Sequence, residues 1–385
     1  MPHYDYLIAG GGAAGLGLVH ALVRHGLPDR SILLVERDGE SVLQRTWCWL
    51  AESPTDFDAL AACTWEQVRV TAPGFNQVIP LGRYRLRLLR GQDFSNHVHA
   101  VLAAHPNVTL ARAELPPLTN AAGVVRVELG GDAVTAFWGF DSRFQPEAIS
   151  IQPGKHHSLV QQVTGWEVEM DREVFDPATP TLLDFSTPQA SLVQFFSVLP
   201  FSARRALVRC TRISGQAAPA GESQAALRGY VDGLAGEGRY AVLHEENGTL
   251  PLTDAPFPRR TGLRIMNIGM RGGCIKPSTG WGFLCIQREA AAIAGSLVRR
   301  LHPFDLPPVP RRYALLDRIL LDLIQRRPAD CPAMAARLFR RNPMERILGF
   351  FNEENSTLQD VRLLASLPWG RFLAAAARLL VLRRV

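Results

Sequence analysis

An apolar strand that runs straight into a glycine-rich turn constrains the fold of this chain more than any other feature. The strand covers residues 6–9, and the turn holds Gly10, Gly12 and Gly15. Gly10 permits a tight turn into a helix, Gly12 lets a pyrophosphate approach the backbone, and Gly15 lets the helix pack closely on the sheet. Glu36 ends the next apolar run, where its carboxylate can accept hydrogen bonds from a ribose diol. The pattern predicts a dinucleotide-binding domain without identifying the dinucleotide.

The composition is that of a globular protein. Of the 385 residues, 47% are hydrophobic and 20% are charged. The six cysteines show no Cys-x-x-Cys spacing and no secretory signal is evident, so we expect free thiols, a reduced cytoplasmic setting and no metal site. The net charge of +6 comes largely from arginines in the last third of the chain. No nucleic-acid-binding motif accompanies them, and we expect no nucleic-acid partner.

A second glycine-rich segment covers residues 269–283 and leads into a helix. Its glycines let backbone N–H groups approach a flavin, and the start of the helix favours negative charge on a reduced flavin ring. A plain glycine-rich loop is the alternative. In this order the two motifs are typical of the split FAD site of two-domain flavoproteins. We expect cofactor contacts from Gly10, Gly12, Ala14, Gly15, Glu36, Arg45, Asp141, Gly272, Gly273, Thr279 and Gly280.

The order of strand-like and helix-like patterns predicts an α/β fold. We expect a Rossmann-like FAD-binding domain, an interleaved substrate domain built on a mixed or antiparallel sheet, and a C-terminal helical region. The FAD-binding domain is assigned to residues 1–80, 120–155 and 250–302. The substrate domain is assigned to residues 81–119 and 156–249, and the helical region to residues 303–385.

The end of the chain predicts a basic amphipathic helix. Arg371 and Arg378 share one helical face, and Leu373 and Leu380 share another. No apolar run reaches the roughly 18–20 residues that span a bilayer. The helix can therefore lie on a membrane surface, which would make the protein peripherally associated with the cytoplasmic membrane. A surface helix packed on the core, with its arginines in solvent, is an equally weighted alternative.

Motifs along nearly the whole chain resemble those of the bacterial lycopene β-cyclases. The Arg-Thr-Trp-Cys-Trp run and the Lys-Pro-Ser-Thr-Gly loop are specific to that family, whereas the first glycine motif is shared among flavoproteins. After that motif, the matching segments follow in the family's order at residues 45–49, 140–143, 162–167, 183–185, 198–202, 246–253 and 272–280.

The resemblance implies a flavoprotein that converts the open ψ end groups of lycopene, or of a related acyclic carotenoid, into the β-ionone rings of β- or γ-carotene. FAD, kept reduced by NADPH or NADH, is used without net redox change. A proton adds at C2, the C5=C6 double bond attacks the cation at C1, and C6 loses a proton. Aromatic side chains can stabilise that cation in an apolar tunnel. The expected tunnel residues are Trp47, Trp49, Phe195, Phe196, Trp281 and Phe283, although ordinary core packing explains the two neighbouring tryptophans equally well.

One position departs from the family. Arg209 stands where the family carries a glutamate thought to act as acid or base, and a guanidinium cannot donate a proton to an alkene. Glu246 is the first substitute, because burial in an apolar cleft favours a protonated carboxyl group, and Asp184 is the second. Surface or ion-paired carboxylates are the alternative for both.

Two other functions remain open at this point. An FAD-dependent monooxygenase or polyprenyl reductase would use the same fold with true electron transfer. A catalytically silent flavin-binding partner of a carotenoid assembly is the third hypothesis, which the departure at Arg209 allows.

Overall fold

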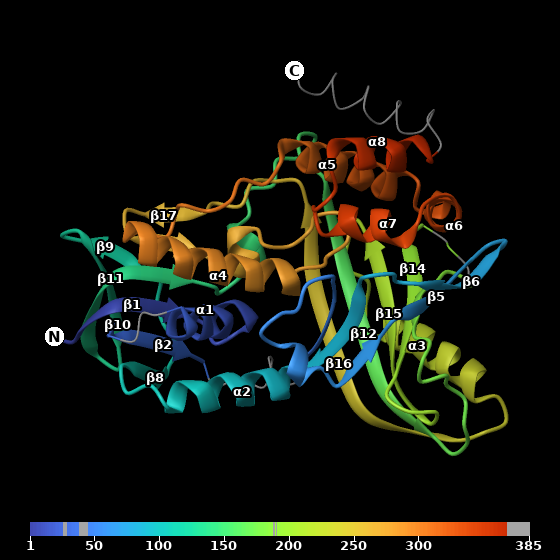
Figure 1. Cartoon of the computed structure of the whole chain (residues 1–385), viewed down its shortest axis with the longest axis horizontal. Coiled ribbons are helices and arrows are strands. Elements are labelled where there is room, and N and C mark those ends of the chain that lie inside the picture. Colours follow the sequence, from blue (N-terminus) through green and yellow to red (C-terminus); the bar gives the residue numbers. More distant parts are fainter. Residues whose placement is uncertain (26–28, 38–44, 188, 190, 368–385) are drawn as a thin grey trace.

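The computed structural model describes residues 1–25, 29–37, 45–187, 189 and 191–367. These residues form two large sheets side by side, with a group of C-terminal helices over the second sheet (Figure 1). Residues 371–380, which carry the predicted arginine and leucine faces of the last helix, lie outside the described part. Within that part, no helix combines the length and the apolar character that crossing a membrane requires.

The first sheet is an α/β layer whose central strands are parallel. In spatial order its strands are β17 (Arg260–Gly262), β18 (Ile265–Asn267), β11 (Asp132–Asp141), β1 (His3–Ala9), β2 (Ile32–Glu36) and β8 (Val108–Arg112), while β10 (Val124–Leu129) and β9 (Thr119–Ala121) extend from β11. Helices α1 (Ala13–Arg24), α2 (Gly91–Ala103) and α4 (Phe283–Arg300) share one core with the sheet. Apolar side chains of β10 pack on its other face. Burial on both faces explains the uninterrupted apolar runs of β1 and β2.

The second sheet is mixed. Its strands run in the order β16 (Tyr240–Thr253), β12 (Ser158–Met170), β15 (Arg205–Ser214), β14 (Val193–Pro200), β13 (Thr181–Asp184), β5 (Gln67–Ala72) and β6 (Phe75–Pro80). All neighbours are antiparallel except β13 and β5. Helix α3 (Ala220–Ala235) packs on one face. The other face contacts α5 (Arg311–Arg326), α6 (Cys331–Arg341), α7 (Met344–Phe351) and α8 (Thr357–Ala365).

A small sheet joins the two halves. It consists of β3 (Thr46–Ala51), β7 (Arg85–Arg90) and β4 (Cys63–Trp65). Successive side chains of a strand point to opposite faces, so Leu50 enters the core beneath the second sheet while Trp49 and Ala51 enter the core of the first. Short 3-10 helices complete the described elements at Asp58–Leu60, Pro146–Ala148, Gly269–Gly272 and Pro328–Asp330.

The predicted architecture, an α/β layer with an interleaved mixed sheet and a helical C-terminal region, is confirmed. The strands do not follow the proposed boundaries everywhere. β5 and β6 belong to the second sheet, although residues 1–80 were assigned to the FAD-binding domain. β8 pairs with β2, and α2 packs against α1, although residues 81–119 were assigned to the substrate domain. The local pattern of a strand does not reveal its partner, because pairing is decided by contacts distant in sequence.

The close contact between α1 and the end of β1 depends on Gly15. A Cβ atom at this position would overlap the carbonyl oxygen of Gly10, which itself has a φ of +106°. We therefore expect Gly15→Ala to lower the free energy of unfolding by about 1–3 kcal/mol, measured by urea denaturation.

Gly229→Ala is the matched control, because Gly229 also lies inside a helix but a Cβ there meets no atom within 4 Å. Its expected effect is a gain of about 0.4–1 kcal/mol. Equal stability of the two variants would contradict the close contact at Gly15.

Candidate functional site

A continuous cavity of about 1560 Å³ lies between the two sheets and extends beneath the C-terminal helices. Pockets for one small ligand commonly measure about 300–1,000 Å³, so this cavity has room for a cofactor and a substrate together. The glycine turn and the second glycine-rich segment line one part, and the second sheet and α5 to α8 line the rest. A single cavity thus connects the two regions that carry the sequence motifs.

The start of α1 lies at the cavity. Gly10, Gly12 and Ala14 line it, and a Cβ at Gly12 would meet no atom within 4 Å. No side chain caps the helix, and its first turn contains no acidic residue. Its first N–H groups therefore remain available to an anion, and the helix dipole favours negative charge there. Gly15 is buried behind the turn and shapes it without lining the cavity.

Glu36 ends β2 at the same part of the cavity. Its Oε1 lies 3.4 Å from Nε2 of His99 on α2, and both residues line the cavity. The hydrogen bond that His99 donates to the Glu36 carboxylate raises the pKa of His99 despite the opposing effect of burial. Sequence reasoning found Glu36 but missed His99, because α2 carries no motif and its packing against α1 is a tertiary contact.

The second glycine-rich segment contributes in two ways. Thr279 and Gly280 line the cavity, whereas Gly272 and Gly273 do not. Gly273 has a φ of +83°, and a Cβ on Gly272 would lie 2.5 Å from the carbonyl oxygen of Asn267. These two glycines therefore form the bend that brings the later residues to the cavity. Helix α4 starts there too, again with no acid in its first turn.

Asp141 lines the cavity and forms ion pairs with two arginines. The carboxylate is buried at the end of β11, 2.8 Å from Nη2 of Arg143 and 3.7 Å from Nε of Arg271. Both arginines line the cavity as well; they lie in segments singled out from the sequence but were not among the expected cofactor contacts. Arg271 also donates a hydrogen bond of 2.7 Å to the carbonyl oxygen of Arg143. Arg45 lines the cavity with an exposed side chain.

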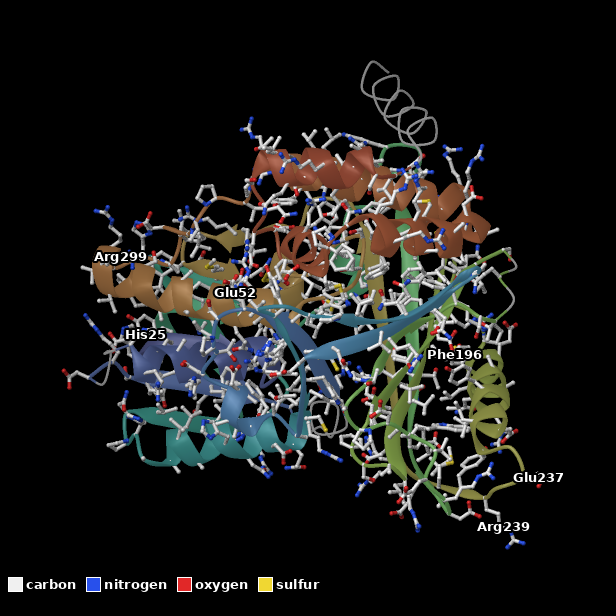
Figure 2. The ribbon with its side chains drawn as sticks, turned by 45° about the vertical axis from the view of Figure 1, so that its right-hand side comes forward. His25, Glu52, Phe196, Glu237, Arg239 and Arg299 are labelled. Carbon is white, nitrogen blue, oxygen red and sulfur yellow. A yellow bond between two sulfur atoms is a disulfide. The ribbon has the colours of Figure 1, made fainter. Side chains whose placement is uncertain are left out.

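Four of the six expected tunnel residues line the cavity: Trp47, Phe195, Trp281 and Phe283. The Trp47 and Phe283 rings stack with their centroids 5.3 Å apart. Trp49 is only 1% exposed and packs in the core behind Phe283. Phe196 points to the opposite face of the second sheet, where it stacks on Tyr230 of α3 at 4.0 Å (Figure 2). Strand alternation forbids neighbouring Phe195 and Phe196 from sharing a face.

Arg209 and Glu246 contact each other across a glycine, which has no side chain to separate them. They lie on β15 and β16, the two neighbours of β12, and both pair in register with Gly165. A Cβ on Gly165 would lie 2.8 Å from Cγ of Glu246 and 3.2 Å from Cγ of Arg209. The glycine therefore leaves the space through which Nε of Arg209 donates to Oε1 of Glu246. Both partners line the cavity.

The guanidinium of Arg209 is held from several sides. Nη2 donates to the carbonyl oxygen of Thr46 at 2.7 Å, and Nη1 lies 3.7 Å from Sγ of Cys48. Burial lowers the pKa of Arg209, but the Glu246 carboxylate outweighs this effect and the net pKa is raised. Burial also raises the pKa of the Cys48 thiol. Glu246 is 6% exposed, and its Oε2 is buried without a hydrogen-bond partner. Glu246 thus lines the cavity and has one buried carboxylate oxygen with unused acceptor capacity.

Asp184, the second carboxylate expected from the sequence, lies away from this cavity. It borders a small pocket beside α3, where it accepts hydrogen bonds from Tyr230 Oη at 2.7 Å and from the Ser186 N–H at 2.8 Å. Burial and the bond to Asp184 raise the pKa of Tyr230, which keeps the hydroxyl a donor. The second sheet therefore separates Asp184 from Glu246.

The prediction of free thiols is wrong for two cysteines. Cys274 and Cys285 form a disulfide, with their Cα atoms 5.8 Å apart. The loop between them folds back onto the first turn of α4, a contact that Cys-x-x-Cys spacing does not detect. In the described part of the chain the other four cysteines are free. Nor do any three His, Cys, Asp or Glu side chains there form a group that could hold a metal ion.

Solved structures show which fold this arrangement represents. A geranylgeranyl bacteriochlorophyll reductase-like protein from Thermoplasma acidophilum has a TM-score of 0.60 and 14% identity, covering 98% of this chain and 96% of that one. The p-nitrophenol 4-monooxygenase PnpA from Pseudomonas putida has a TM-score of 0.62 and 15% identity, covering 93% of this chain and 100% of that one. Klebsiella pneumoniae HpxO, solved with FAD and uric acid, has a TM-score of 0.62 and 15% identity, covering 96% of this chain and 98% of that one. The expected two-domain flavoprotein fold is confirmed.

Sequence comparison identifies the family. The Lycopene beta-cyclase of Pseudescherichia vulneris is 26% identical over 327 residues, covering 80% of this chain and 78% of that protein. The Lycopene beta-cyclase of a Paracoccus species is 26% identical over 313 residues, covering 76% of this chain and 73% of that protein. The family model described as Lycopene cyclase protein matches residues 5–377. The chain therefore belongs to the lycopene cyclase family.

Proposed function

We propose that this protein closes the ψ end groups of lycopene, or of a related acyclic carotenoid, into β-ionone rings with reduced FAD and without net redox change. The observation that carries the proposal is the continuous cavity. One part has uncapped helix N–H groups and Glu36, and the other is lined by aromatic side chains and by Glu246. Family membership supports the substrate class.

The residues at the first part of the cavity fit FAD. The uncapped start of α1 suits a pyrophosphate, Glu36 suits a ribose diol, and Thr279 and Gly280 bring a second backbone segment to the same space. The start of α4, free of acidic residues, favours an anionic ring. Bound and reduced, FAD would supply negative charge beside a developing carbocation. NADPH or NADH is the proposed source of the electrons.

We assign Glu246 to the loss of the proton from C6, and its protonated carboxyl group then returns a proton to C2 of the next end group, so that the two transfers balance. A carboxylate paired with a guanidinium is a proton acceptor, and its Oε2 is the atom without a partner. Arg209 acts as a positioning residue, because its bonds to Glu246 and to the Thr46 carbonyl hold the carboxylate at the cavity wall. Trp47 and Phe283 line the same cavity and suit a cation that passes from C1 to C5 as the ring closes.

The outer face of α5 and α8 exposes apolar and basic side chains, as a protein with a membrane-dissolved substrate would need. Leu315, Leu358 and Val361 are 50%, 58% and 51% exposed, and Arg311 and Arg362 are exposed on the same helices. The two helices are joined by the 2.8 Å ion pair of Arg312 with Asp360. Exposed apolar and basic side chains together suit an anionic lipid surface. We propose that this face associates peripherally with the cytoplasmic membrane, where an acyclic carotenoid dissolves.

Replacing Glu36 tests the FAD assignment. Glu36→Gln removes a charged acceptor, so the affinity for FAD is expected to fall by about tenfold, measured by titration of the apoprotein. The pKa of His99, followed by NMR, should fall in the same variant. Glu52→Gln is the control, because Glu52 lies at the surface and pairs there with Arg83, 3.1 Å away. Unchanged FAD affinity in Glu36→Gln would reject the ribose contact.

Replacing Glu246 tests the reaction. Expression in lycopene-accumulating cells is expected to yield β- or γ-carotene, and the purified holoprotein should consume no stoichiometric NAD(P)H per ring. Glu246→Gln should retain FAD and lower the rate of cyclisation by about 100- to 10,000-fold, measured by chromatography of the carotenes.

Glu167→Gln is the matched control for this loss. Glu167 is also a buried partner of arginines, Arg90 and Arg205, but it does not line the cavity. Equal rates in the two variants would reject the role of Glu246. One NAD(P)H consumed per product would favour the monooxygenase or reductase, and wild-type protein without product would favour a silent flavoprotein.

Replacing the exposed apolar residues of α8 tests the membrane assignment. The double variant Leu358→Glu, Val361→Glu is expected to lower co-sedimentation with anionic vesicles by about tenfold, because it removes apolar contact and adds negative charge. Leu263→Glu is the control, since Leu263 is 67% exposed on the turn between β17 and β18. If the wild type, the double variant and Leu263→Glu co-sediment equally strongly, the outer face of α5 and α8 is not the membrane-binding surface.

A further inference from the structure

The cavity continues past Glu246 into a space that the reacting end group does not need. We call it the helical chamber, the part enclosed between the second sheet and helices α5 and α6. On the helix side it is lined by Leu316, Leu320, Ile324, Met334, Ala335 and Leu338. On the sheet side Phe195 of β14 faces it, so the chamber adjoins one of the aromatic residues already described.

The lining residues follow helical periodicity. On α5, Leu316, Leu320 and Ile324 are four residues apart, and on α6 Met334 and Leu338 have the same spacing. Each helix thus directs one apolar face to the chamber. All of these lining residues except Leu316 are only partly buried, although Leu320, Ile324, Ala335 and Leu338 pack against the core. A gap is therefore maintained between these helices and the sheet.

The helix side of the chamber offers nothing to a polar ligand. In the described part of α5 to α8, every side chain that lines the cavity is apolar or a cysteine. A nucleotide or sugar packed against these helices would find no replacement there for its hydrogen bonds to water. A hydrocarbon chain loses none and gains from leaving water. The chemistry of the helix side therefore favours an apolar occupant.

We infer that the helical chamber holds the part of the carotenoid chain that lies beyond the end group undergoing cyclisation. This inference rests on the proposed function, since it takes the end group to lie at Glu246. A long polyene has no polar group, and the continuous cavity lets it extend from Glu246 to α6 without meeting a charged side chain of α5 to α8. The size of residue 335 then limits how much chain is accommodated.

Ala335→Trp tests the chamber by filling it. The variant is expected to bind FAD like the wild type but to retain about tenfold less acyclic C40 carotenoid on purification, and to convert it about tenfold more slowly. An acyclic apo-carotenoid with one ψ end group, shortened at the other end, should still be converted within about threefold of the wild-type rate. The shorter chain leaves the chamber unfilled, so the added indole does not displace it.

Ala333→Trp is the matched control, because Ala333 lies on α6 but is exposed and does not line the cavity. It should behave like the wild type toward both substrates. Leu320→Trp fills the chamber from α5 and replaces Ala335→Trp if that variant does not fold. The inference is overturned if the filled variants treat both carotenoids like the wild type, or if they lose both equally while FAD content is unchanged.

Carotenoid binding separates this inference from the proposed function. If the wild type converts neither carotenoid, cyclisation fails as the function. The chamber is then judged by retained C40 carotenoid alone, which Ala335→Trp should reduce and Ala333→Trp should not. A phospholipid chain found by mass spectrometry in the purified wild type, with no carotenoid bound even when both are supplied, overturns the assignment of the occupant.

Discussion

A buried ammonium joins the second glycine-rich segment to the C-terminal helices. Lys276 follows the bend of the second glycine-rich segment, and its Nζ lies 3.1 Å from Asp317 of α5 and 3.1 Å from Glu353, which follows α7. Ser278 donates a 2.6 Å hydrogen bond to the same Asp317 carboxylate. Because removing one partner of a buried ion pair leaves a charge without compensation, these contacts hold the segment to the C-terminal helices. The proposed flavin loop is therefore bound to α5, the helix that also lines the helical chamber.

This coupling gives the Lys-Pro-Ser-Thr-Gly loop a second role. Ser278, Thr279 and Gly280 line the cavity, while the Lys276 and Ser278 side chains bind Asp317 of α5. A loop that merely approached a cofactor would not need a buried lysine. The arrangement instead links the position of the cofactor-facing backbone to the helices that enclose the proposed carotenoid chain.

The row formed by Arg209, Gly165 and Glu246 explains how a carboxylate reaches the cavity despite the departure at residue 209. Side chains on strands that flank a third strand are normally separated by the side chain between them. With glycine in the middle, Arg209 orients Glu246 instead of replacing it. Sequence reasoning named both residues, but the role of Gly165 follows only from the register of β12 with its two neighbours.

The sequence alone determined the features that are local in the chain: the strand and glycine turn at residues 6–15, the acid at the end of β2, and the helical character of the C-terminal region. Motif order was enough to indicate the fold and the family. Tertiary structure decided which side chains meet, because sheet register and strand alternation depend on partners distant in sequence. Those contacts put Phe196 and Asp184 behind the sheet, brought His99, Arg143 and Arg271 to the cavity, and enclosed the helical chamber.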